Sequence, residues 1–272
     1  MKSRPADRAN AVAPDVMRAA REVAGRLAKE RAEAVVLVGS RVRGDAHDHS
    51  DLDLIALGRG PLRRLEIHEP FVVSVQWRTA AQVRDGFSNL ADLSAILGWR
   101  RAVIVHDPKK LAAGVRREAL AWTWDAPGAR ADAWVAEQIT DYAEEVFRLV
   151  GSLRAGRYSA AAVQRSVLAL RLPRVLAVHR RTLYDGDSQL YEAIVAGMGE
   201  PWRRAHRRAL GVQAETLEQT CGAALELYAL AAEETKQLLD ERQFAVVRGA
   251  CAAAGFPIGR RPAAREAVKP RR

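Results

Sequence analysis

The chain has 272 residues, of which 49% are hydrophobic and 28% are charged, and it carries a formal net charge of +10. This balance is typical of a globular protein with a buried core, and it excludes a wholly disordered chain. No apolar run reaches the roughly 18–20 residues of a membrane-spanning helix, and the N-terminus lacks the apolar segment of a signal peptide. We therefore expect a cytoplasmic protein that does not enter a membrane.

The two cysteines, Cys221 and Cys251, are too few for a disulfide framework or a structural zinc site of their own. The positive charge is a feature of proteins that bind nucleic acid or phosphate, but a preference for arginine codons produces the same composition. Nucleic acid is therefore an unlikely partner that composition alone does not exclude.

The first half of the chain mixes predicted helices and strands. Pro14 suits the first position of a helix, and apolar residues recur on one helical face from Val16 to Leu27. Thr79 and Gln82 have the spacing of a capping box, which predicts a helix start there. A further short helix is expected over residues 91–97. The predicted strands are 34–38, 51–57, 65–67, 71–77 and 102–106, with a hairpin turn near Glu69-Pro70.

The second half of the chain has no convincing strand. Residues 125–128, Asp-Ala-Pro-Gly, form a strong breaker, and later apolar residues follow the narrow stripes of helices packed in a bundle. Pro173 is expected to kink or divide a helix. We predict an α+β fold with three parts: a mixed-sheet domain flanked by helices over 1–125, an all-α helical bundle over 129–257, and a basic, disordered tail over 258–272.

One segment, residues 38–55, combines a glycine-containing turn, arginines and two aspartates, which are residues suited to binding phosphate and metal ions. A buried strand ends at Gly39-Ser40, where glycine permits a turn and a close approach of the backbone to a ligand. Backbone amides and the Ser40 hydroxyl can then bind phosphate oxygens, and Arg43 adds a planar cation that suits phosphate. The pattern predicts a phosphate-binding turn formed by Gly39, Ser40 and Arg43.

Asp51 and Asp53 follow about ten residues later. Residues i and i+2 of a strand share a face, so the two carboxylates project side by side while Leu52 and Leu54 enter the core. Two adjacent carboxylates repel each other and favour a bound cation, and Mg²⁺ prefers one or two carboxylates plus substrate phosphates. The alternative is an exposed edge strand with two solvated acids.

These residues resemble the nucleotidyltransferase superfamily, which includes DNA polymerase beta and the antibiotic nucleotidyltransferases. Gly39-Ser40 and Asp51-Leu52-Asp53 match its motif in identity and spacing. The order of elements resembles the two-domain antibiotic-modifying enzymes. The resemblance implies that Gly39 and Ser40 hold a nucleoside triphosphate and that Asp51 and Asp53 ligate Mg²⁺.

The sequence departs from the family at its third carboxylate. The corresponding strand is Phe71–Trp77, where Ser74 and Gln76 occupy the face on which the acid is expected. Glu66 and Glu69 are nearby alternatives. A base from the helical half is another solution, for which Glu144 is the leading candidate and Asp141 and Glu145 are the alternatives.

We therefore expect a Mg²⁺-dependent nucleotidyltransferase that moves a nucleoside monophosphate, AMP from ATP in the first instance, onto a hydroxyl of a small-molecule acceptor. The acceptor is expected in the cleft between the two domains, and an antibiotic is the leading class by resemblance. One alternative is an antitoxin-like or regulatory protein that acts on a protein partner. A second alternative is nucleotide transfer to RNA.

Overall fold

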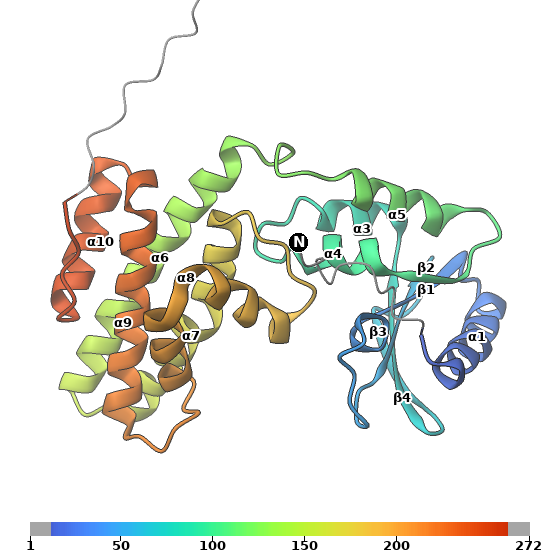
Figure 1. The fold of residues 1–272 in the computed structure, drawn as a ribbon, viewed down its shortest axis with the longest axis horizontal. Coiled ribbons are helices and arrows are strands. Elements are labelled where there is room, and N and C mark those ends of the chain that lie inside the picture. The colour runs from blue at the N-terminus through green and yellow to red at the C-terminus, as the bar shows by residue number, and fades with distance from the viewer. Residues whose placement is uncertain (1–11, 261–272) are drawn as a thin grey trace, which may run out of the picture. The chain divides into compact units, whose positions relative to one another are not determined.

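The computed structural model describes residues 12–260, and these form two compact units (Figure 1). The first unit contains residues 12–126 together with Leu183–Gly186. The second contains Pro127–Thr182 and residues 187–260. Most of the predicted tail, 261–272, lies outside the described residues.

The first unit is built on a five-stranded mixed sheet with the order β3-β4-β2-β1-β5. β2 and β4 are parallel, and the other neighbouring strands are antiparallel. The predicted hairpin is present, and its turn contains a cis Glu69–Pro70 peptide. The strands are β1 (Ala34–Val38), β2 (Leu52–Leu57), β3 (Arg63–His68), β4 (Phe71–Arg78) and β5 (Val103–His106).

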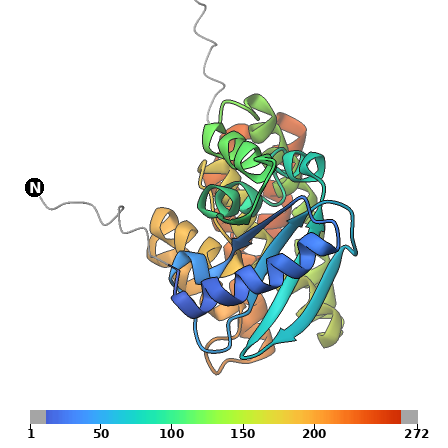
Figure 2. The same ribbon diagram turned by 90° about the vertical axis from the view of Figure 1, so that its right-hand side faces the viewer.

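Helix α1 (Pro14–Lys29) lies across one face of this sheet (Figure 2). Its predicted apolar stripe is buried in one core with alternate residues of the strands. Ion pairs at the rim also join the helix to β3, where Arg64 contacts Glu30 at 2.9 Å and His68 contacts Glu22 at 3.0 Å. Because α1 occupies this face, the side chains of Asp53 and Ser74 belong to the opposite one.

Helices α3 (Ala80–Gly86), α4 (Ser94–Arg101) and α5 (Leu111–Ala121) complete the first unit. The capping box predicted at Thr79 and Gln82 is confirmed, with both reciprocal hydrogen bonds present. The helix predicted over 91–97 begins later, at Ser94. The side chains of Asn89 and Asp92 accept hydrogen bonds from backbone amides two residues on, which stabilises turns in place of a helix.

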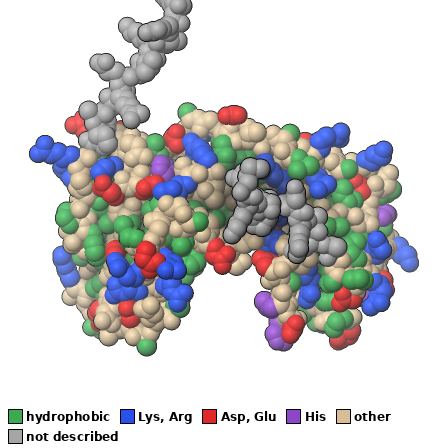
Figure 3. Space-filling view, viewed as in Figure 1, with side chains coloured by type: hydrophobic (Ala, Val, Ile, Leu, Met, Phe, Trp, Pro, Cys, Tyr) green, Lys and Arg blue, Asp and Glu red, His purple; other side chains and the backbone are tan. Residues whose placement is uncertain are grey.

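The second unit is helical, which confirms the predicted fold class. None of the helices within residues 12–260 has both the length and the apolar character that crossing a membrane requires. Lys and Arg side chains are interspersed with acidic and apolar ones on the face shown in Figure 3. The elements are α6 (Ala129–Arg154), α7 (Tyr158–His179), α8 (Asp187–Ala209), α9 (Leu217–Thr235), the short 3₁₀ helix η1 (Lys236–Leu238) and α10 (Glu241–Ala253).

The expected division at Pro173 is wrong, because α7 continues through it. A proline at 173 leaves the carbonyl of Ala169 without its helical donor. His206 of α8 supplies a replacement, since its Nε2 lies 2.9 Å from that oxygen. The helix break lies instead at Gly199 of α8, which has φ 77° and ψ −168° just before Pro201.

His206 is buried and stacks on Tyr191, and burial lowers its pKa from the usual 6.5. The unfolded chain therefore binds a proton more readily than the folded one, and stability falls as pH drops through about 6.5. The wild-type protein should lose stability between pH 7.5 and pH 5.5. In His206→Gln, whose neutral amide can still donate to Ala169, we expect this drop in the free energy of unfolding to be smaller by about 1 kcal/mol. Urea denaturation at both pH values measures this, and an unchanged pH dependence would contradict it.

Candidate active site

The turn after β1 is built around Gly39. Its φ of 83° and ψ of −163° lie in a region that is essentially reserved for glycine. The chain then makes a single helical turn, α2 (Ser40–Arg43), and ends it at Gly44 in the left-handed conformation. The amides of Val42 and Arg43 donate to the Gly39 carbonyl, whereas those of Ser40 and Arg41, like the first amides of any helix, have no backbone acceptor within residues 12–260.

Asp53 lies directly against this turn. Asp53 pairs with Val38 in the antiparallel β1–β2 ladder, so the start of β2 lies next to the end of β1. A Cβ placed on Gly39 would lie 2.4 Å from Asp53 Oδ2. The contact requires glycine at position 39 for space as well as for backbone conformation.

Asp51 and Asp53 interact electrostatically. The pKa of Asp53 is raised to about 6, mainly by burial and next by the neighbouring Asp51 charge and a hydrogen bond to the Asp51 side chain. Arg63 and Arg43 act in the opposite direction but do not cancel these effects. The two carboxylates thus form the paired, charge-repelling arrangement that the sequence predicts, and a cation would relieve the repulsion.

Arg41 holds the backbone that leads into Asp51. Its guanidinium donates from Nε to the carbonyl oxygens of Ser50 and Asp51, both at 3.2 Å. It also lies over the Phe71 ring, 4.7 Å from the centroid. The sequence did not indicate this role, in which Arg41 fixes the position of the first acid.

Arg43 is engaged with acids of the protein. Its Nε lies 3.1 Å from both carboxylate oxygens of Asp45, and its Nη1 donates to the Asp185 carbonyl at 2.9 Å. Its side chain is only 10% exposed. The structure therefore assigns Arg43 to the link between the turn and Asp185, and its contact with phosphate stays a prediction.

Asp185 belongs to the segment Leu183–Gly186, which packs with the first unit although it lies between α7 and α8 in sequence. The Asp185 side chain is buried and lies 3.6 Å from Arg43 and 3.4 Å from Arg101. Burial raises its pKa, and the two arginines oppose that shift. Tyr184 anchors the segment further, since its hydroxyl accepts a hydrogen bond from the Leu93 amide at 3.4 Å.

The sequence leaves Ser74 and Gln76 as the residues where the family resemblance implies a third carboxylate, and the strand register puts Ser74 opposite Asp53. Ser74 is in register with Asp53 across the parallel β2–β4 pair and is 1% exposed. Its hydroxyl has no hydrogen-bond partner among residues 12–260. Glu66 does not substitute for an acid here, because it pairs with Arg26 of α1 on the other face of the sheet.

Two acids, Asp51 and Asp53, therefore lie together beside the turn. Within the described part of the chain, no group of three or more His, Cys, Asp or Glu side chains is arranged to hold a metal ion. Glu144 and Glu145 lie on α6 in the second unit, where both pair with Arg148, at 2.6 Å and 3.0 Å. A role for Glu144 as the base stays a prediction.

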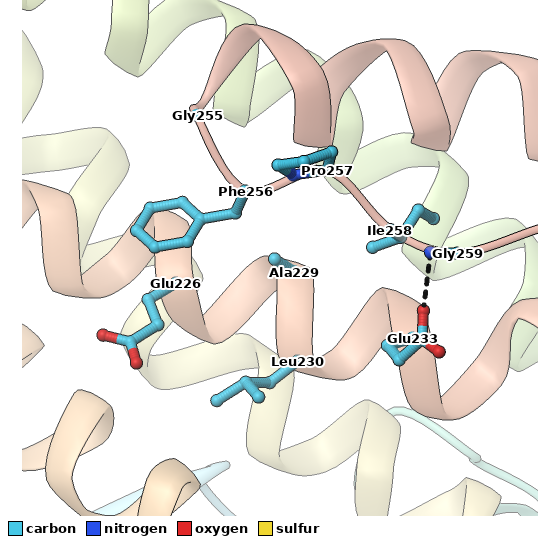
Figure 4. A pocket seen from close by; sticks show the side chains of 9 residues that line it. All are labelled: Glu226, Ala229, Leu230, Glu233, Gly255, Phe256, Pro257, Ile258 and Gly259. Atoms are coloured by element: carbon cyan, nitrogen blue, oxygen red, sulfur yellow. Dashed lines mark hydrogen bonds between the residues drawn. The ribbon is translucent and has the colours of Figure 1, made fainter.

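A groove of about 470 Å³ lies in the second unit, between α9 and the segment after α10 (Figure 4). Its carboxylates already have partners. Glu233 accepts a hydrogen bond from the Gly259 amide at 3.2 Å, and Glu226 lies 3.6 Å from Arg204. The groove contains none of the motif residues and is separate from the candidate site.

Comparison with known proteins agrees with this geometry. The family described as a nucleotidyltransferase domain matches residues 17–119, which contain the turn and both acids. A solved structure similar to this chain is that of a nucleotidyltransferase-like protein from Exiguobacterium sibiricum 255-15. It has a TM-score of 0.46 and 14% identity, and the match covers 79% of this chain and 74% of that one. No curated protein matches the chain significantly.

The Gly39–Asp53 contact gives a direct stability test. Gly39→Ala places a side chain in a left-handed conformation and against the Asp53 carboxylate, so we expect a loss of about 2 kcal/mol or more in the free energy of unfolding. Gly114→Ala, in the interior of α5 with open space around it, is the control and should be neutral or stabilising. Equal effects of the two substitutions in urea denaturation would refute the close contact.

The Asp51–Asp53 repulsion gives a second test. Between the unfolded pKa of 3.8 and the folded value of about 6, the folded protein binds more protons, so stability falls as pH rises through this window. Asp53→Asn should therefore raise the free energy of unfolding of the unliganded protein above that of wild type at pH 8. This gain should be about 1–2 kcal/mol larger at pH 8 than at pH 4, after allowance for solvent screening. Asp48→Asn, in the exposed loop, is the control. A stabilisation by Asp53→Asn that does not depend on pH would contradict the raised pKa.

Proposed function

We propose that the protein, whose residues 17–119 match the nucleotidyltransferase domain family, transfers a nucleoside monophosphate from a nucleoside triphosphate to a hydroxyl group of a small-molecule acceptor. The contact between Gly39 and Asp53 carries the proposal, because it brings the phosphate-binding turn and the acid pair into one place. ATP is the expected donor.

The residues present fit a divalent cation. Two adjacent carboxylates, one with a pKa raised to about 6 partly by the other, form an oxygen site whose charge a cation would balance. Asp51 and Asp53 would hold Mg²⁺, with the remaining ligands supplied by phosphate and water. When bound, Mg²⁺ supplies charge neutralisation for the triphosphate.

The turn would hold the triphosphate of the donor. The free amides at the start of α2 and the Ser40 hydroxyl can donate to phosphate oxygens, and Gly39 lets the chain approach them closely. Arg41 keeps Asp51 in place by holding its carbonyl and that of Ser50. Fixed donors of this kind stabilise developing negative charge without rearranging during the reaction.

In the reaction, an acceptor hydroxyl oxygen attacks the α-phosphorus of the triphosphate. A new phosphorus–oxygen bond forms, the bond to the bridging oxygen breaks, and pyrophosphate leaves. The hydroxyl proton passes to a base, for which Glu144 is the candidate predicted from the sequence. The chain thus contributes alignment and electrostatic stabilisation, which are the main sources of rate in phosphoryl transfer.

A second candidate is a regulatory nucleotide-binding protein that acts on a protein partner. Ser74 supports it, because a hydroxyl stands in register with Asp53 where the family resemblance implies a third acid. Such a protein would bind nucleotide without releasing pyrophosphate.

Pyrophosphate release separates the two candidates. We expect release from ATP with Mg²⁺ and a suitable hydroxyl acceptor, its loss on chelation with EDTA, and a fall of at least about a hundredfold in Asp53→Asn. Asp48→Asn should retain wild-type turnover. Wild-type turnover in Asp53→Asn would rule out the proposed site, and nucleotide binding without turnover across an acceptor panel would favour the regulatory candidate.

A further inference from the structure

The face of the sheet that carries the acids continues into an exposed apolar strip. The strip consists of Leu65 and Ile67 of β3 and Val72 of β4, whose side chains are 60%, 65% and 45% exposed. Single exposed apolar residues are common, but three on one sheet face beside a candidate site form a continuous patch.

Strand register places this strip beside the acids. Leu65 pairs with Ser74, and Ser74 pairs in turn with Asp53. Paired residues on neighbouring strands share a face and lie about 5 Å apart. Leu65 therefore lies about two strand spacings, roughly 10 Å, from Asp53, which is within the length of one drug-sized molecule.

The charges around the strip define what can bind there. Arg63 is on the same face of β3 as Leu65 and Ile67, and its charge is close enough to Asp53 to lower the pKa of that carboxyl group. The acid of β3, Glu66, is on the opposite face and paired with α1. The strip thus offers apolar surface and one cation. The acids next to it on this face, Asp51 and Asp53, are those proposed to hold Mg²⁺, so with the cation bound a polyamine would find no free carboxylate along the strip.

We propose that this strip binds an apolar, uncharged or anionic part of the acceptor, and that the acceptor class is therefore an apolar hydroxyl compound and not a polycationic aminoglycoside. The inference rests on the proposed function and specifies its substrate class. The acceptor would lie with its apolar part over Leu65 and Ile67 and its hydroxyl toward Asp53.

The fluorescent probe 1-anilinonaphthalene-8-sulfonate tests the strip without knowledge of the acceptor, since it combines aromatic rings with one anionic group. Titration of the full chain should give a dissociation constant about tenfold weaker in Leu65→Ser/Ile67→Ser than in wild type. Arg63→Gln should weaken binding about threefold through loss of the cation. Leu120→Ser, an equally exposed leucine on α5, is the control and should match wild type.

Competition then tests the substrate class. Chloramphenicol, an uncharged aromatic alcohol, should displace the probe, and kanamycin, a polyamine, should not. Unchanged probe binding in Leu65→Ser/Ile67→Ser, or displacement by kanamycin, would overturn the inference. A dimer in sedimentation that this double variant converts to a monomer would also overturn it, because the strip would then be a subunit interface.

Failure of this inference is distinguishable from failure of the proposed function. Binding of Mg²⁺ and a non-hydrolysable ATP analogue should be the same in Leu65→Ser/Ile67→Ser and in wild type. Absence of that binding in the wild-type protein would refute the proposed function. Unchanged probe binding in Leu65→Ser/Ile67→Ser, with nucleotide binding intact, would refute only the role of the strip.

Discussion

The candidate site depends on the missing side chain of Gly39. The turn after β1 and the Asp53 carboxylate occupy adjacent space only because nothing larger than hydrogen projects from that residue. The same residue adopts a backbone conformation that other amino acids rarely take. A steric requirement and a conformational one therefore coincide at one position, and both place the turn that we propose to bind phosphate beside an acid.

The paired carboxylates of Asp51 and Asp53 beside this contact are typical of a site that a bound ligand completes. The Asp51–Asp53 pair is held by its surroundings although the two charges repel, with Arg41 fixing the backbone of the first acid and the β1–β2 ladder fixing the second. Ser74 adds a buried hydroxyl without a partner among the described residues. Unrelieved repulsion and an unsatisfied polar group are features that functional sites often retain at a cost in stability.

The sequence predicted the features that depend on local pattern. Alternation of apolar residues located the strands, put Asp53 on the face opposite the core leucines, and left Ser74 or Gln76 where the family resemblance implies an acid. Long-range contacts could not be predicted. Asp185 reaches Arg43 from 142 positions away, and no local signal marks it. The continuation of α7 through Pro173 could not be predicted either, because the carbonyl that the proline leaves unpaired is satisfied by His206 from another helix.

Titration of Asp53 itself tests whether Asp51 and Asp53 together form a cation site next to the turn. Nuclear magnetic resonance of the ¹³C-labelled carboxyl group reports its pKa in the free protein and with Mg²⁺ and a non-hydrolysable ATP analogue. We expect a pKa of about 6 in the free protein and a clear fall when both ligands are present. An ordinary pKa near 3.8 that the ligands leave unchanged would contradict it.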